Sequence, residues 1–213
     1  PPDYPPAQPP QTVQPVQPVQ TGQPKRSPYE VYELTLLKYI VRYGEQILFD
    51  YVDEETNEHI VMRVAEYIRY DLERDDLTFY TPIIKSMLDE AADKCKTEGF
   101  IASRYFLAHP NPNVSRLAAN LISEKYQLSK YHSKGQKIIS DEERLHELVP
   151  RLLLDFKLSI VDEEMKHTLQ ALANPEIAND PQRYMEIMQH YKELHKTQSI
   201  MAQRAGDRVV LKI

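Results

Sequence analysis

The chain has 213 residues, of which 41% are hydrophobic and 27% charged, enough for one sizeable domain or two small ones. It contains no apolar run of about 18 residues, so we expect no transmembrane span and no membrane partner. The formal net charge of -6 argues against a broad nucleic-acid surface, so nucleic acid is expected to bind weakly or not directly. The single cysteine, Cys95, excludes an intramolecular disulfide and fits a reducing, cytoplasmic location.

The first 27 residues differ in composition from the rest of the chain. They hold most of its prolines, chiefly in PPDYPPAQPP and QTVQPVQPVQ, and show no apolar periodicity. Such a segment buries too little surface to offset the entropy of ordering it, so residues 1–27 are predicted to form a disordered Pro/Gln-rich linker. Residues 15–18 also fit the spacing of an SH3 ligand, but a spacer explains the composition better. A linker here further predicts that the chain is a fragment of a larger protein.

Residues 28–149 are predicted to form a helical bundle with one β-hairpin. Ser27-Pro28-Tyr29-Glu30 has the pattern of a capping box and starts a helix that Gly44 is placed to end. Residues 47–52 and 59–64 are rich in β-branched and aromatic side chains and flank a polar turn, which predicts a β-hairpin. A short helix over 44–51 is the alternative. Further helices are expected over 65–74, 82–96, 100–109 and 112–128, the last with Asn111 as N-cap.

The connection to the C-terminal part is less regular. A polar loop is expected over residues 131–140, followed by a short amphipathic helix over 141–148. Pro150 then either kinks this helix or starts the next one. The tail GDRVVLKI, residues 206–213, is predicted to be strand-like or docked.

A long helix is predicted over residues 150–173, and its apolar side chains sort into two stripes at about 100° per residue. One stripe runs the whole length: Leu154, Leu158, Val161, Met165, Thr168/Leu169 and Leu172. The other, about 150° away, stops early: Leu152, Leu153, Phe156 and Ile160. A helix that is apolar on both sides is buried, whereas a single stripe implies one neighbour and one wet face. The first half is therefore expected inside the bundle, and the second half should project from it.

A second helix is predicted to pack on the projecting half. Asn174 should end the long helix because it precedes Pro175, and Asp180-Pro181 should start the next one. Its stripe is Tyr184, Ile187/Met188, Tyr191, Leu194/His195, Gln198, Met201/Ala202 and Ala205, with Gly206 placed as a stop. The predicted fold is therefore mainly all-α: a helical bundle with a small β-hairpin insertion, then a long helix and a projecting C-terminal αα-hairpin over 150–213. Such a thin hairpin buries too little surface to form a core, and it is typical of an element that binds another protein.

Two Glu-x-x-His units are the strongest hint of chemistry: Glu143 with His146, and Glu164 with His167. In four-helix di-iron proteins such units come from two adjacent helices. A continuous helix would hold these two roughly 31 Å apart, and a turn at Pro150 would leave too few residues for two full-length neighbours. Five scattered glycines provide no phosphate loop. We assign no catalytic residue and no metal ligand, and expect this part of the protein not to be an enzyme.

Three strings are long and specific: YFLAHPNPNVSRLAANLISEKYQLSKYHSK (105–134), DEERLHELVPRLLLDFK (141–157) and GDRVVL (206–211). They resemble the C-terminal region of DNA primases from one group of bacteria, and the similarity covers residues 29–213. Bacterial primases have a zinc-binding domain, an RNA polymerase domain with an acidic two-metal site, and a C-terminal domain that binds the replicative helicase. In that domain a helical bundle precedes a helical hairpin, which supplies the main grip on the helicase. The β-hairpin predicted here departs from this all-helical pattern.

The resemblance implies a non-catalytic module that docks primase on the hexameric DNA helicase and couples primer synthesis to unwinding. No cofactor is expected in this chain, since zinc and magnesium belong to the upstream domains. Apolar anchors on an otherwise polar helix are the usual means of such recognition. Five partner-binding residues are predicted: Leu172, Pro175, Ile177, Met185 and Ile200. The first three are expected to be the most exposed apolar residues at the far end of the hairpin, and the last two lie off the packing stripe of its second helix. For these five residues the alternative is an ordinary surface or core position without a role. For the chain the alternatives are a generic helical scaffold or adaptor, and a di-metal enzyme.

Overall fold

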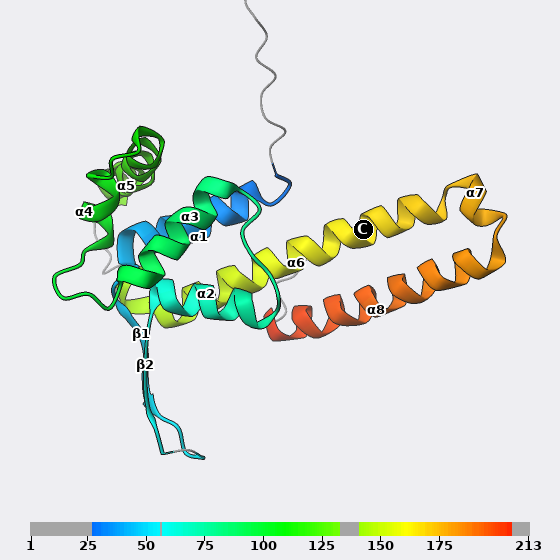
Figure 1. Cartoon of the computed structure of the whole chain (residues 1–213), viewed down its shortest axis with the longest axis horizontal. Helices are drawn as coiled ribbons and strands as arrows, with labels where there is room; N and C mark the ends of the chain where they lie inside the picture. Colours follow the sequence, from blue (N-terminus) through cyan, green and yellow to red (C-terminus); the bar gives the residue numbers. More distant parts are fainter. Residues whose placement is uncertain (1–26, 56, 133–140, 206–213) are drawn as a thin grey trace, which may run out of the picture.

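The computed structural model describes residues 27–55, 57–132 and 141–205, without the side chains of 124–132 and 205. Over these residues the fold is mainly helical, with one two-stranded antiparallel sheet and two long C-terminal helices packed together, as predicted (Figure 1). The predicted linker apart from Ser27, the polar loop from residue 133 on, Gly206 and the strand-like tail lie outside the described residues.

The bundle is assembled around α1. Its elements are α1 (Glu30–Tyr43), α2 (Val64–Arg74), α3 (Pro82–Lys94), α4 (Ala102–Leu107), α5 (Pro112–His132) and the 3-10 turn η1 (Asp141–Arg144). Helix α1 contacts α2, α3, α4, α5 and the long helix α6 (Leu145–Leu172). Its side chains Leu36, Leu37, Ile40 and Val41 are fully buried. From Glu33 to Tyr43 no side chain of α1 is exposed, so the other helices cover it apart from its first turn.

Polar side chains close two helix ends of the bundle. The carboxylate of Glu33, which is fully buried, accepts hydrogen bonds from the backbone N–H of Tyr80 and Thr81, the latter at 3.2 Å, and from the Thr81 hydroxyl at 2.5 Å. It therefore satisfies the N-terminus of α3, where a negative charge is favoured. At α5 the predicted cap is present, because the Asn111 side chain accepts from the N–H of Asn113 at 2.9 Å.

The predicted β-hairpin is confirmed, which excludes the alternative short helix. Strand β1 (Ile47–Val52) pairs antiparallel with β2 (His59–Arg63), with a bulge between Ile47 and Phe49. The second strand ends at Arg63, and Val64 is already the first residue of α2. Leu48 is buried in the core, and the Phe49 ring lies 5.1 Å from the Tyr67 ring of α2. The base of the hairpin is thus fixed to the bundle, and the rest extends away from it (Figure 1).

Helix α6 begins at Leu145 and passes through Pro150, so the predictions of a separate helix over 141–148 and of a helix start at Pro150 are wrong. A proline six residues into a helix removes the hydrogen bond to the carbonyl four residues before it, here that of His146. His146 lies on the exposed side of α6, so solvent reaches this part of the helix. Leu145 and Val149 on the other side are buried in the core and hold the first turns in place.

Helix α6 leaves the core where its second stripe ends, as predicted. Leu153 and Phe156 belong to the main core, and Ile160 packs against it. Beyond that point its neighbours are α8 (Pro181–Ala205) and the short α7 (Pro175–Ala178) at the far end. Helices α6 and α8 form a two-helix arm that extends sideways from the bundle (Figure 1). The short helix α7 was not predicted, because a loop was expected between Asn174 and Asp180.

Candidate functional site

The arm is held together by one apolar seam. On α6 the seam is formed by the residues of the predicted long stripe, and Leu158, Met165 and Thr168 are its buried members. On α8 the predicted stripe is half-buried: Tyr184, Ile187, Met188, Tyr191, Leu194, Gln198, Met201 and Ala202. No described side chain of α8 is fully buried. Both helices therefore keep wide outer faces that no other described part of the chain covers.

Caps and polar contacts fix the turn and the pairing of the arm. Asn174 accepts from the N–H of Glu176 at 3.0 Å, and Asp180 accepts from the N–H of Arg183 at 3.2 Å, so both predicted boundary residues cap helices. The Gln198 amide donates to Asp162 at 2.7 Å across the seam. These contacts are exposed and each contributes little to stability. They set the register of the two helices, while the apolar seam supplies most of the energy.

A buried charge network anchors the base of the arm. Lys157 of α6 is 5% exposed, and its Nζ lies 2.5 Å from a carboxylate oxygen of Asp71 and 2.5 Å from one of Asp75, at the end of α2. Arg74 also contacts Asp71, at 2.7 Å. The hydrogen bond from Lys157 is the main cause that lowers the pKa of Asp75 below its ordinary value. The network therefore ties α6 to α2 at the level where the arm leaves the core.

The five predicted partner-binding residues have very different exposures. Met185 is 69% exposed and Ile200 44%, and Pro175 is also exposed. Leu172 was expected to be among the most exposed apolar residues, and this is wrong, because it is half-buried in the seam. Ile177 was expected to be among the most exposed apolar residues, and this is wrong, because it is only 8% exposed. Helix α7 is the reason, since it places Ile177 on its inner side over the end of the seam.

Leu169 is an exposed apolar residue that the sequence analysis placed in the seam. It is 49% exposed, whereas the adjacent Thr168 is 5% exposed. The Thr168 hydroxyl donates to the carbonyl of Glu164 at 2.7 Å, so it is satisfied within its own helix and can be buried without a partner on α8. The predicted stripe could continue through either Thr168 or Leu169, and in the structure it continues through Thr168.

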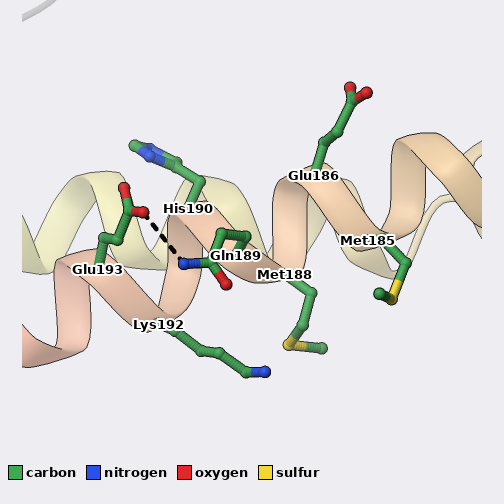
Figure 2. A pocket seen from close by; sticks show the side chains of 7 residues that line it. All are labelled: Met185, Glu186, Met188, Gln189, His190, Lys192 and Glu193. Atoms are coloured by element: carbon green, nitrogen blue, oxygen red, sulfur yellow. Dashed lines mark hydrogen bonds between the residues drawn. The ribbon is translucent and has the colours of Figure 1, made fainter.

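The outer surface of α8 presents two unlike sides. Met185, Met188 and Lys192 point to one side of the helix, and Glu186 and His190 point to the other (Figure 2). Together with Gln189 and Glu193 they line an open hollow along the helix. On α6, Glu164 and His167 line a neighbouring hollow with Glu186 and His190, and His190 Nε2 lies 3.5 Å from Glu164. One side of the arm is thus apolar with a lysine, and the other carries carboxylates and imidazoles.

The two Glu-x-x-His units are not brought together. His146 and His167 are both in α6, so the rise of a continuous helix separates them by roughly 31 Å. His167 Nε2 lies 3.2 Å from Glu163, four residues before it on the same helix. Within the described ranges no group of three or more His, Cys, Asp or Glu side chains is arranged to hold a metal ion.

Another titratable cluster links α3 to the α4–α5 connection. Glu90 accepts from the Tyr105 hydroxyl at 2.8 Å and lies 3.1 Å from His109 Nε2. Because His109 Nδ1 accepts from the N–H of Asn111 at 3.1 Å, its Nε2 carries the proton and donates to Glu90. Burial, and then the hydrogen bond to Glu90, raise the pKa of Tyr105 to about 12. Each group already has a partner in the bundle, so the cluster reads as a structural link.

A family model described as "Domain of unknown function (DUF8430)" matches residues 20–209. The chain belongs to the DUF8430 family. The match covers both the bundle and the arm, so in this DUF8430 chain they are parts of one family unit. Neither the curated proteins nor the solved structures contain a match to the chain. No helix in the described part of the DUF8430 chain combines the length and apolar character needed to cross a bilayer.

Proposed function

We propose that this chain is the C-terminal, non-catalytic module of a bacterial DNA primase, and that it docks the primase on the replicative hexameric helicase. The family description names no function. Support comes from the resemblance of residues 105–134, 141–157 and 206–211 to primase C-terminal regions, and from a fold in which a bundle precedes a helical hairpin. In this role the module couples primer synthesis to unwinding by holding the polymerase domain beside the moving helicase.

The observation that carries the proposal is the projecting α6–α8 arm with large apolar side chains on its outer faces. Leu169, Met185 and Ile200 are 49%, 69% and 44% exposed on helices that are otherwise polar outside. Apolar anchors of this kind insert into grooves of a partner, and a few of them provide most of the binding energy. We assign the main contacts to Met185 and Ile200, with Pro175 and Leu172 contributing at the far end and Leu169 added to the set. Ile177 is assigned a supporting role under the tip because of its burial.

The remaining parts of the activity are assigned outside this chain. Primer synthesis, and the zinc and magnesium that it needs, belong to upstream domains of the primase. The module acts in the cytoplasm and contributes little to nucleic-acid binding, in keeping with its net charge of -6.

The test is a calorimetric titration of the protein with the N-terminal domain of the replicative helicase. We expect saturable binding that Met185→Gln and Ile200→Gln each weaken about tenfold, as is usual for apolar anchors in an interface. Val31→Gln is the matched control, because Val31 is an equally exposed apolar residue, at 72%, but lies on α1 of the bundle. It should leave binding unchanged.

Three results would contradict the proposal. A folded protein that fails to bind the helicase domain would leave a generic scaffold as the better description. Binding that Val31→Gln weakens as much as the arm substitutions would move the contact to the bundle. Stoichiometric metal in the purified protein, measured by elemental analysis, would favour the di-metal enzyme instead.

A further inference from the structure

The β-hairpin is a second projecting element, separate from the arm. It extends from the bundle in a different direction from α6 and α8 (Figure 1). Only its base is packed: Leu48 is buried and Phe49 lies against Tyr67, whereas Asp50, Tyr51 and Val52 are all exposed. An isolated two-stranded hairpin is marginally stable in water, and a third strand stabilises it. No third strand pairs with β1 or β2 among the described residues.

The register identifies which backbone groups point outward from β1. Val52 is opposite His59, and in the next pair the N–H of Asp53 donates to the carbonyl of Glu58 at 2.9 Å. Hydrogen-bonded and non-hydrogen-bonded pairs alternate along an antiparallel ladder. Val52–His59 and Asp50–Val61 are therefore the non-hydrogen-bonded pairs. The N–H and C=O groups of Asp50 and Val52 consequently face away from β2, in the spacing that a third strand requires.

The apolar side chains in the outer part of β1 are more exposed to solvent than those of β2. Tyr51 and Val52 are 51% and 55% exposed, whereas Val61 of β2 is 37% exposed and Ile60 is half-buried. An exposed edge with apolar side chains is a template for pairing with another chain. Such an edge binds extended peptides through main-chain hydrogen bonds, and alternate side chains provide the specificity.

The charge of the hairpin selects the kind of strand that fits. Between Ile47 and Met62 the sequence has five acidic residues, Asp50, Asp53, Glu54, Glu55 and Glu58, and no lysine or arginine. The one imidazole, His59, has its Nε2 2.6 Å from Asp50 Oδ1. A second copy of the hairpin would bring like charges together, which is unfavourable. An extended segment that carries lysine or arginine meets complementary charge along the same edge.

We propose that the outer edge of β1, from Asp50 to Val52, binds an extended segment of another protein in which basic and apolar residues alternate. The segment adds a third strand to the sheet. Its backbone pairs with Asp50 and Val52. Because successive side chains of a strand point to opposite faces of the sheet, its apolar side chains lie beside Tyr51 on one face and its basic side chains lie beside Asp50 on the other. This site is independent of the arm, so it holds or fails separately from the proposed docking on the helicase.

The test uses the whole chain and a capped seven-residue peptide of alternating lysine and valine. Binding is followed by NMR titration and by hydrogen exchange of the amides of Asp50 and Val52. We expect saturable binding that weakens with added salt, together with protection of these two amides. The same peptide N-methylated on alternate backbone nitrogens, and a glutamate–valine peptide of equal length, should each bind at least about tenfold more weakly, because two main-chain bonds or the charge complementarity are lost.

Two substitutions at one position give the matched comparison. Val52→Pro removes an outward N–H without breaking the ladder to β2, so the fold is kept while the edge is blocked. It should weaken the lysine–valine peptide about tenfold, whereas Val52→Thr, which keeps the N–H and the branched side chain, should not. Absence of binding at millimolar peptide, or equal binding by Val52→Pro, overturns the proposal. A concentration-dependent dimer that Val52→Pro abolishes overturns it in favour of a second copy of the chain.

Discussion

Replacement of Lys157 by methionine tests whether the buried charge network fixes the arm to the bundle. The substitution keeps the length and apolar stem of the side chain but leaves Asp71, which is 6% exposed, without its closest cation. Breaking a buried ion pair by removal of one partner costs about 3–5 kcal/mol. Because Arg74 remains 2.7 Å from Asp71, we take the lower end, about 3 kcal/mol. For a domain of this size that corresponds to a fall in Tm of roughly 6–12 °C.

The assay is urea unfolding followed by circular dichroism, with two further variants. Lys166→Met is the matched control, because Lys166 lies on the same helix but its pair with Glu163, at 3.2 Å, involves a lysine that is 61% exposed. It should cost less than about 0.5 kcal/mol. Asp71→Asn combined with Lys157→Met should recover most of the loss, since the stranded charge is removed. The reasoning is refuted if Lys157→Met costs no more than Lys166→Met, or if the double variant is as unstable as the single one.

Three further predictions follow from side chains of the arm and the bundle. In urea unfolding, Met165→Ala should lower the free energy of unfolding by about 2 kcal/mol or more, and Leu169→Ala by less than about 1 kcal/mol. Of these two residues only Met165 is buried in the seam, so equal losses would contradict the assigned seam. The pKa of Asp75 is lowered in the folded state, so its stabilising contribution is present above the unfolded pKa of about 4 and is lost as the pH falls below it. Asp75→Asn should therefore reduce the fall in the free energy of unfolding at acid pH. An unchanged dependence of stability on pH would count against the Lys157 hydrogen bond. In an ultraviolet pH titration the tyrosinate signal that Tyr105→Phe removes should appear only near pH 12, because burial and the hydrogen bond to Glu90 raise the pKa of Tyr105. Its appearance near pH 10 would contradict this environment of Tyr105 in solution.

The periodicity of apolar residues predicted the helices well because burial follows it directly. The second stripe of α6 stops at Ile160, and this is where the helix leaves the core. On α8 the predicted stripe coincides with the half-buried side chains. The β-hairpin was also predictable, because two segments rich in β-branched and aromatic residues flank a polar turn, although the pattern alone left a short helix over 44–51 as the alternative. The local sequence pattern is sufficient to predict an element when the packing of that element requires only an apolar surface.

The features that were missed depend on contacts between distant residues or on a choice between neighbours. Lys157 and Asp71 are 86 positions apart, and no local signal pairs them. For Pro150 the sequence left a kink and a helix start as alternatives, because the cost of the hydrogen bond that a proline removes depends on how exposed that part of the helix is, which only the fold decides. Ile177 was expected to be exposed because α7, a helix of four residues, is too short to be predicted from periodicity.

The uninterrupted course of α6 has a mechanical consequence. One helix of 28 residues forms part of the core and one of the two helices of the arm, and Lys157 fixes it to α2 where it leaves the core. Such a helix has no hinge between the core and the arm about which the arm could rotate independently of the bundle. A force applied at the tip of the arm is therefore transmitted to the core through α6, which is roughly 42 Å long, and the arm and the bundle rotate together.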